Sequence, residues 1–244
     1  EYTYYDTNSA GGGHAVMVVG WDDNYPKERF AGYYQPSNNG AWLVRNSWGN
    51  GYMDYFWMSY ETYSLRDGAW ALDFSKDWPY DNNYQLDGGL DTSTAYMTQA
   101  ANVFDVNQKS GVASESLKAV SLSLTNSANV SYKIEVYTNL KDRSDPLSGT
   151  RQDAATTTGT TSYAGIYTIP LRNQVELLPG TSFSVVVTSN DGIDYETAMW
   201  YSNSNGICWD SDVENNDRSF YSYGGTFYEW SSGNFCIKAF TSNN

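Results

Sequence analysis

The sequence predicts a mainly β protein. Short strand-like runs recur along the chain, and clusters of Gly, Asn and Asp separate them. Aromatic residues make up 16% of the chain, with 22 Tyr and 9 Trp, and these residue types favour strands. The 244 residues suffice for one large or two modest domains.

The first strand-like segments lie within residues 10–62. An apolar run at residues 15–19 follows the sequence Gly11-Gly12-Gly13-His14, and His14 is the only histidine in the chain. A second apolar run at residues 41–44 precedes Asn46-Ser47-Trp48-Gly49, and residues 51–60 resemble a further strand. The intervening stretch from Asp22 to Gly40 is polar and contains Asn, Pro and Gly, so we expect a surface loop there.

A second set of strands begins after a polar, turn-rich boundary near residues 75–85. Several of these strands alternate apolar and polar residues with a period of two, which favours an antiparallel sandwich or jelly roll. The expected strands are 101–106, 117–124, 131–137, 165–169, 174–177, 182–187 and 235–240. The predicted organisation is therefore one domain at 1–75, a linker at 76–86 and a β-sandwich at 87–244.

Gly13-His14-Ala15 and Asn46-Ser47-Trp48-Gly49, in this order, closely resemble the carboxy-terminal β lobe of a papain-like cysteine peptidase. The histidine and asparagine are 46 − 14 = 32 positions apart. The resemblance implies that His14 is the catalytic base and later the acid for the leaving amine. It implies that Asn46 orients the imidazole and that Trp48 covers the hydrogen bond between them. A thiol attacks a peptide carbonyl as the thiolate, which explains the need for a nearby, correctly oriented imidazole.

Two parts of the peptidase that the resemblance implies are absent from these 244 residues. No cysteine precedes His14, and the upstream glutamine of the oxyanion hole is also absent. Three explanations are open: a proteolytic product whose other lobe forms a second chain, a truncated polypeptide, or a degenerate relative. The lack of a start methionine and of a signal peptide favours the first two. We expect this chain to be inactive alone, and we expect no cofactor for catalysis.

The second half resembles the lectin-like domain that follows the peptidase domain in surface cysteine peptidases of anaerobic Gram-positive bacteria. The matching segments are 101–104, 115–120, 134–139, 178–183 and 234–240. The resemblance implies an exported protein, extracellular or at the cell wall, that hydrolyses peptide bonds of other surface proteins. The accessory domain would act as a spacer, a docking surface or a glycan binder.

Two ligands are considered for this half. Sugars stack on exposed aromatic rings, although the same rings serve equally as core or loop anchors; the candidates are Trp200, Tyr201, Trp209, Tyr221, Tyr223, Tyr228 and Trp230. A structural calcium ion is plausible from the family resemblance, because calcium prefers several oxygen ligands on loops. The candidate ligands are Asp210, Asp212, Glu214 and Asp217, for which the alternative is a solvated acidic loop.

Cysteine and charge limit the remaining possibilities. Cys208 and Cys236 are the only cysteines, and they form either a disulfide or two buried free thiols. The net charge of −14, without a basic patch, argues against nucleic-acid binding. No run of 18 apolar residues exists, so no membrane span is expected.

The competing functional hypothesis is a non-catalytic surface binding or scaffolding module, including a glycan binder, with a vestigial peptidase lobe.

Overall fold

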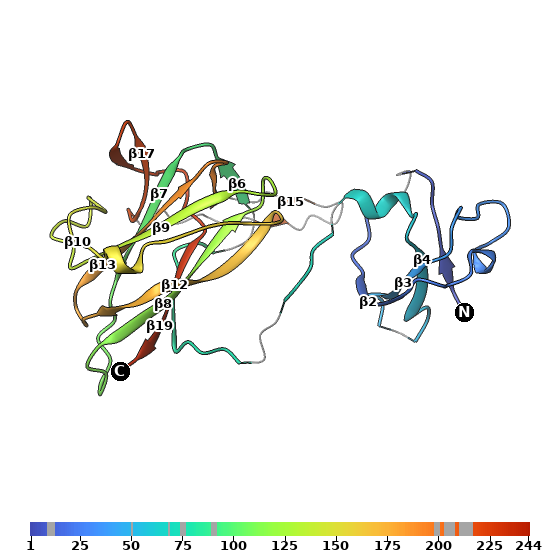
Figure 1. Cartoon of the computed structure of the whole chain (residues 1–244), viewed down its shortest axis with the longest axis horizontal. Helices are drawn as coiled ribbons and strands as arrows, with labels where there is room; N and C mark the ends of the chain where they lie inside the picture. Colours follow the sequence, from blue (N-terminus) through green and yellow to red (C-terminus); the bar gives the residue numbers. More distant parts are fainter. Residues whose placement is uncertain are drawn as a thin grey trace. The chain divides into compact units, whose positions relative to one another are not determined.

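The computed structural model describes residues 1–8, 13–49, 51–67, 69–73, 77–88, 92–197, 201–202, 208–209 and 217–244. The chain divides into two compact units, Glu1–Lys76 and Asp77–Asn244 (Figure 1). The described elements are strands and three short 3-10 helices: η1 (Lys27–Arg29), η2 (Tyr63–Asp67) and η3 (Asp153–Ala155). The predicted mainly β fold is confirmed.

The first unit is a four-stranded sheet with the order β1-β4-β3-β2. Its strands are β1 (Thr3–Tyr4), β2 (Met17–Asp22), β3 (Ala41–Arg45) and β4 (Tyr55–Ser59). β1 runs parallel to β4, and the other neighbours are antiparallel. β2 therefore forms one edge of the sheet.

The stretch from Asp22 to Gly40 is largely exposed but is anchored at two buried aromatic residues. Tyr25 and Phe30 pack with Ala41 in a small core, and the ring of Tyr25 stacks on Trp57 at 4.6 Å. At the end of the stretch, Gly40 has a φ of +115°, and a Cβ there would meet the Tyr60 ring at 2.6 Å. The loop therefore has a fixed path between β2 and β3.

The second unit contains two sheets of seven and four strands, and all of their pairings are antiparallel. The larger sheet has the order β10-β9-β13-β7-β17-β18, with β11 also paired to β9. Its strands are β7 (Gln99–Asp105), β9 (Ser131–Thr138), β10 (Thr150–Arg151), β11 (Thr157–Thr160), β13 (Ser182–Ser189), β17 (Ser219–Tyr223) and β18 (Thr226–Glu229).

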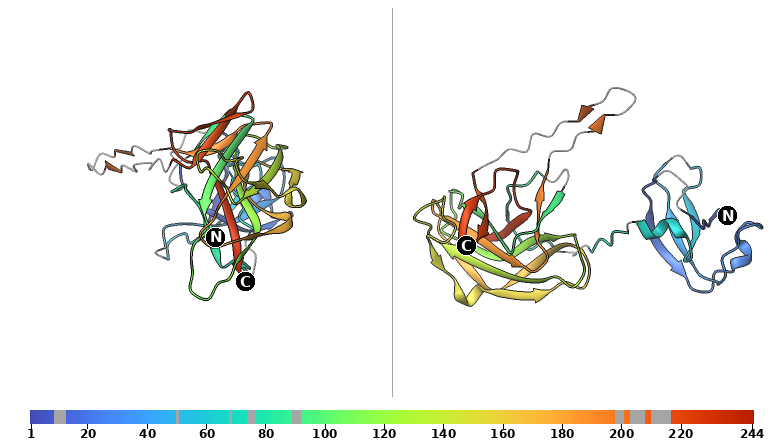
Figure 2. Two further views of the ribbon diagram at one scale, coloured as in Figure 1. Left: turned by 90° about the vertical axis from the view of Figure 1, so that its left-hand side faces the viewer. Right: turned by 90° about the horizontal axis from the view of Figure 1, so that it is seen from above.

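The smaller sheet has the order β12-β8-β19-β5. Its strands are β5 (Asn82–Tyr84), β8 (Glu115–Leu124), β12 (Gly165–Leu177) and β19 (Ile237–Asn243). Two further pairs join β6 (Thr92–Ala95) to β14 (Ile193–Glu196), and β15 (Tyr201–Ser202) to β16 (Cys208–Trp209). Figure 2 shows the unit from two further directions.

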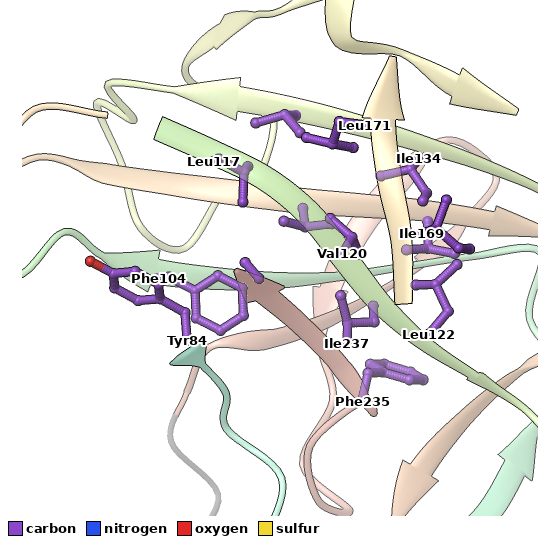
Figure 3. Packing of buried hydrophobic residues seen from close by; sticks show 14 of the residues in the cluster. Tyr84, Phe104, Leu117, Val120, Leu122, Ile134, Ile169, Leu171, Phe235 and Ile237 are labelled. Carbon is purple, nitrogen blue, oxygen red and sulfur yellow. The ribbon is translucent and has the colours of Figure 1, made fainter. Parts of the chain in front are cut away.

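The core of the second unit is formed by the side chains that these two sheets direct toward each other. Figure 3 shows the contacts among Leu117, Val120 and Leu122 of β8 and their neighbours on the adjoining strands. Fully burying one such side chain contributes about 1.5–3 kcal/mol, so this core is the main source of stability for the unit.

Two details of the strands differ from the sequence expectation. The segments expected at 165–169 and 174–177 form one strand, β12, with a register irregularity between Pro170 and Val175. β12 is an edge strand, where a proline without an N–H is tolerated. β5 lies inside the segment expected to be a linker, and it pairs with β19.

Candidate active site

The β2–β3 hairpin brings His14 and Asn46 together. Met17 pairs with Arg45 at the end of this hairpin, so the residues just before β2 face those just after β3. His14 Nε2 lies 2.8 Å from Asn46 Oδ1. The structure thus joins the two residues that the sequence selected from positions 32 apart.

The hydrogen bonds of Asn46 define the imidazole tautomer. The backbone N–H of Ser47 donates to Asn46 Oδ1 at 2.8 Å, which identifies this atom as the carboxamide oxygen because an N–H can only donate. His14 Nε2 must then carry the hydrogen that it shares with this oxygen. In the neutral ring, Nδ1 is left as the proton acceptor.

The turn after β3 positions Asn46. Its backbone N–H donates to the carbonyl of Asp54 at 2.8 Å, and the residue is only 8% exposed. Gly49 and Gly51 have positive φ values of 62° and 75°, conformations that glycine adopts without steric cost. Asn46 is therefore held by its own backbone and not only by its bond to His14.

Aromatic rings lie beside this hydrogen bond. The ring of Trp48 is centred 5.6 Å from the imidazole and tilted by 38°, and Trp48 remains half exposed. Tyr52 stacks on Trp48 at 6.1 Å with nearly parallel planes, and Tyr2 contacts Tyr52 at 6.0 Å. Tyr2 and Tyr52 were not among the predicted site residues; the only signal for Tyr52 in the sequence is its position four residues after Trp48.

The two cysteines belong to the second unit. Cys236 is a buried free thiol. Burial raises the pKa of this thiol strongly, and the nearby carboxylates of Asp87 and Asp194 raise it further. Cys236 therefore stays protonated and has none of the properties of a nucleophile. The side chain of Cys208 lies outside the described residues.

The predicted calcium ligands fall mainly outside the described residues. Asp210, Asp212 and Glu214 lie there, whereas Asp217 is described and has a φ of 52°. Within the described ranges, no group of three His, Cys, Asp or Glu side chains is arranged to hold a metal ion.

The buried carboxylates of the second unit do not fit calcium either. Both oxygens of Asp194 accept hydrogen bonds from protein donors. Glu196 accepts from the backbone N–H of Gly88 and from Asn234, and Asp87 pairs with Lys238 at 3.0 Å. The oxygens named here are bonded to protein groups except Asp87 Oδ1, which is buried without a hydrogen-bond partner among the described residues, as is Glu115 Oε1. These two single oxygens do not make up the set of several ligands that calcium prefers.

The proposed sugar-stacking residues are only partly brought together. Trp200 is outside the described residues, and only the backbone is described for Tyr201 and Trp209. Tyr221 contacts Tyr228 at 5.8 Å and Trp230 at 5.7 Å. Trp230 also contacts Phe235 at 5.4 Å and packs against the core. Tyr221 and Trp230 therefore serve in part as core residues.

Comparison with known proteins decides the family. The family model described as "Lectin like domain" matches residues 84–241, more than half of the chain. This chain belongs to the lectin-like domain family. Its matched residues lie in the second unit, called the lectin-like domain below. No curated protein matches the chain at a significant level.

Two solved structures are similar to the chain over its whole length. One is the clostridial cysteine protease Cwp84 after propeptide cleavage, at 29% identity and a TM-score of 0.67. The other contains the cysteine protease and lectin-like domains of Cwp84, a surface layer associated protein of Clostridium difficile, at 29% identity and a TM-score of 0.66. The chain spans 61% and 55% of these two structures, so it corresponds to only part of each.

Proposed function

We propose that residues 1–76 supply the histidine and asparagine of a cysteine peptidase site, and that the lectin-like domain is its accessory domain. The observation that carries this proposal is the hydrogen bond from His14 Nε2 to Asn46 Oδ1 at 2.8 Å. It leaves Nδ1 available to accept a proton, as a base for a thiol requires. The similarity of the whole chain to Cwp84 supports the same assignment.

In the proposed reaction, Nδ1 of His14 takes the proton of a cysteine thiol supplied by polypeptide outside these 244 residues. The thiolate attacks the scissile carbonyl, and the imidazolium then gives its proton to the leaving amine. Water, deprotonated by the same imidazole, hydrolyses the thioester and regenerates the thiol. Asn46 keeps Nε2 occupied throughout, so that the same ring edge serves both proton transfers.

The exposed side chains of β2 are evidence that another part of the protein completes the site. Met17, Val18, Val19 and Trp21 are between 45% and 68% exposed, although they form the strand that follows His14. Apolar side chains on both faces of an edge strand are expected to be covered by another part of the protein. A lobe that carries the thiol would cover them while it approaches His14.

The proposed location is the cell surface, and the proposed substrates are surface or extracellular proteins. Cwp84 is a surface layer associated protein, which supports this location. No helix among the described residues is long and apolar enough to cross a membrane. A calcium ion held by residues 210–217 stays a prediction.

The experiment that tests the peptidase proposal uses the full reading frame, including polypeptide encoded upstream of residue 1. Hydrolysis of an unfolded protein substrate is compared for the wild type, His14→Ala and Asn46→Ala. Loss of the base is expected to reduce kcat/KM by roughly 10²–10⁴-fold. Native and denaturing mass spectrometry on the same material shows whether a second, cysteine-bearing chain accompanies this one.

Asn24→Ala is the matched control, because Asn24 is an exposed asparagine that follows Asp22, at the end of the β2–β3 pairing opposite to His14 and Asn46. This control is expected to retain full activity. Undiminished proteolysis by His14→Ala would rule out the role assigned to His14. A full-length protein that does not hydrolyse the substrate and that has no upstream cysteine would favour the alternative of a non-catalytic binding module.

A further inference from the structure

One buried carboxylate ties together three segments at one end of the lectin-like domain. Asp194 of β14 is only 1% exposed. It accepts hydrogen bonds from Thr94 at 2.7 Å and from Ser123 at 2.8 Å. It also accepts from both the backbone N–H and the hydroxyl of Thr125, at 2.9 and 2.7 Å. The ends of β6 and β8 are thereby fixed relative to β14.

Three side chains meet at the surface next to the segments that this carboxylate joins. Tyr96 follows β6, Asn126 follows β8, and Asp191 precedes β14. The hydroxyl of Tyr96 donates to Asn126 Oδ1 at 3.3 Å, and Asn126 Nδ2 donates to Asp191 Oδ2 at 2.9 Å. Tyr96 lies two residues after Thr94, and Asn126 lies one residue after Thr125. Asp191 lies three residues before Asp194 itself. The group is thus assembled from three loops, and Asp194 holds residues adjacent to each of them.

The turn that carries Asp191 has a defined conformation. Gly192 has a φ of +81°, and a Cβ there would meet the carbonyl oxygen of Ala95 and the methyl group of Thr94, both at 2.7 Å. Only glycine permits this approach of the turn to β6. On the other side, Asn190 Oδ1 accepts the backbone N–H of Ser131 at 2.8 Å. Asp191 is therefore presented by a turn that is held on both sides.

We propose that Tyr96, Asn126 and Asp191 form a binding site for a neutral saccharide. The Tyr96 ring is 76% exposed and offers an apolar face to the C–H face of a sugar. Asp191 Oδ1 accepts no hydrogen bond from the described residues, so it is available to sugar hydroxyls. The amide of Asn126 retains one N–H as a donor. An apolar face beside a fixed acceptor and a fixed donor matches the chemistry of a pyranose ring.

Charge and exposure favour this site and this ligand class. The site contains a carboxylate, and the chain carries a net charge of −14, so anionic sugars are repelled. The aromatic group at Tyr221 and Trp230 is less suitable, because Trp230 packs against the core. A second exposed ring, Tyr163, lies at the same end: Gly165 pairs with Leu124, so the residues that precede Gly165 face those that follow Leu124.

The test uses the full 244-residue chain and four neutral probes: the methyl glycosides of glucose, galactose, mannose and N-acetylglucosamine. Saturation-transfer NMR detects binding, and titration gives Kd. At least one probe is expected to bind the wild type. Tyr96→Ala and Asp191→Ala are each expected to weaken this binding at least tenfold. Tyr96→Phe is expected to weaken it less, since the ring remains and only the hydroxyl contact to Asn126 is lost.

Tyr33→Ala is the matched control, because Tyr33 is a fully exposed tyrosine in the other unit. Its Kd is expected to equal that of the wild type. The proposal is overturned if no neutral glycoside binds, if binding is unchanged in both Tyr96→Ala and Asp191→Ala, or if methyl glucuronide binds more tightly than methyl glucoside. Proteolysis is not measured here, so the result is independent of the role of His14.

Discussion

The imidazole of His14 donates from Nε2 to Oδ1 of Asn46 over 2.8 Å, across the open end of the β2–β3 hairpin. The same oxygen accepts the N–H of Ser47, so one carboxamide oxygen both caps the turn and fixes the tautomer. This pair is complete within the 244 residues, although the proposed nucleophile is not. The orientation of the base can therefore be tested without the thiol.

The first prediction concerns the tautomer of His14. Since His14 is the only histidine, its ring nitrogens give unambiguous ¹⁵N NMR signals. In the neutral ring, the wild type is expected to show almost only the Nε2–H form. Asn46→Ala removes the acceptor and is expected to give a mixture of both tautomers, whereas Asn24→Ala leaves the spectrum unchanged. A wild-type ring that is mainly Nδ1–H would contradict the assigned hydrogen bond.

The second prediction concerns the aromatic cover of this bond. Trp48 lies beside the imidazole, and Tyr52 stacks on Trp48. Trp48→Ala is expected to expose the shared N–H to water and to speed its exchange with solvent, measured from the NMR signal of the Nε2 proton. Tyr52→Ala removes a ring that stacks on Trp48 and leaves Trp48 itself in place, so its effect is expected to be smaller. Equal exchange rates in all three proteins would mean that Trp48 does not cover the bond.

The sequence identified the pair at the hairpin because a short motif carries it. His14 lies three residues before β2 and Asn46 directly follows β3. Both were predicted from the resemblance of their motifs to a papain-like peptidase, and not from strand patterns alone. The tautomer could not be predicted from the sequence, because it depends on which carboxamide atom the N–H of Ser47 contacts. The tilted ring contact between Tyr2 and Tyr52 joins residues 50 positions apart, and Tyr2 is placed by β1, a two-residue strand that leaves no sequence pattern.

In the lectin-like domain, the sequence predicted the sandwich but not the buried polar contacts. Alternating residues in strands such as β9 and β13 indicated two faces, and hence a sandwich, from the sequence. The contacts of Asp194 with Thr94 and Ser123 join residues 100 and 71 positions apart. Ser, Thr and Asp are also common in exposed turns, so composition alone does not show that Asp194 is buried. The site at Tyr96, Asn126 and Asp191 required the tertiary fold for the same reason.

The third prediction concerns the stability that Asp194 provides. Asp194→Ala leaves the donors of Thr94, Ser123 and Thr125 without their acceptor in a buried location. The expected loss is about 3 kcal/mol in the free energy of unfolding. For a domain of this size it corresponds to a decrease in Tm of about 6–12 °C, measured by calorimetry on the whole chain.

Asp153→Ala is the control for this substitution, because the side chain of Asp153 is 81% exposed and makes one ion pair with Arg151. Its effect is expected to stay within about 0.5 kcal/mol, as for most surface substitutions. If Asp194→Ala lowered the free energy of unfolding by as little as this control, the carboxylate would not anchor the three segments. The sugar site would then lose its proposed support.

The fourth prediction concerns acid stability through Asp105. Burial acts to raise the pKa of Asp105, but the hydrogen bonds from Ser182 and Arg218 and the charges of Arg218 and Arg143 outweigh it, so the pKa lies below its ordinary 3.8. A depressed folded-state pKa gives stability that is present above the unfolded value and is lost as pH falls through the folded value.

Asp105→Asn is therefore expected to destabilise the lectin-like domain at pH 7 by roughly 1 kcal/mol, a figure that allows for solvent screening of a side chain that is one-third exposed. The difference from the wild type should shrink as pH falls below 3.8, because protonation removes the same charge from the wild type. Urea unfolding at a series of pH values measures both curves. A difference that stays constant from pH 7 to the acid limit would show that Asp105 acts through packing and hydrogen-bond geometry, and not through its charge.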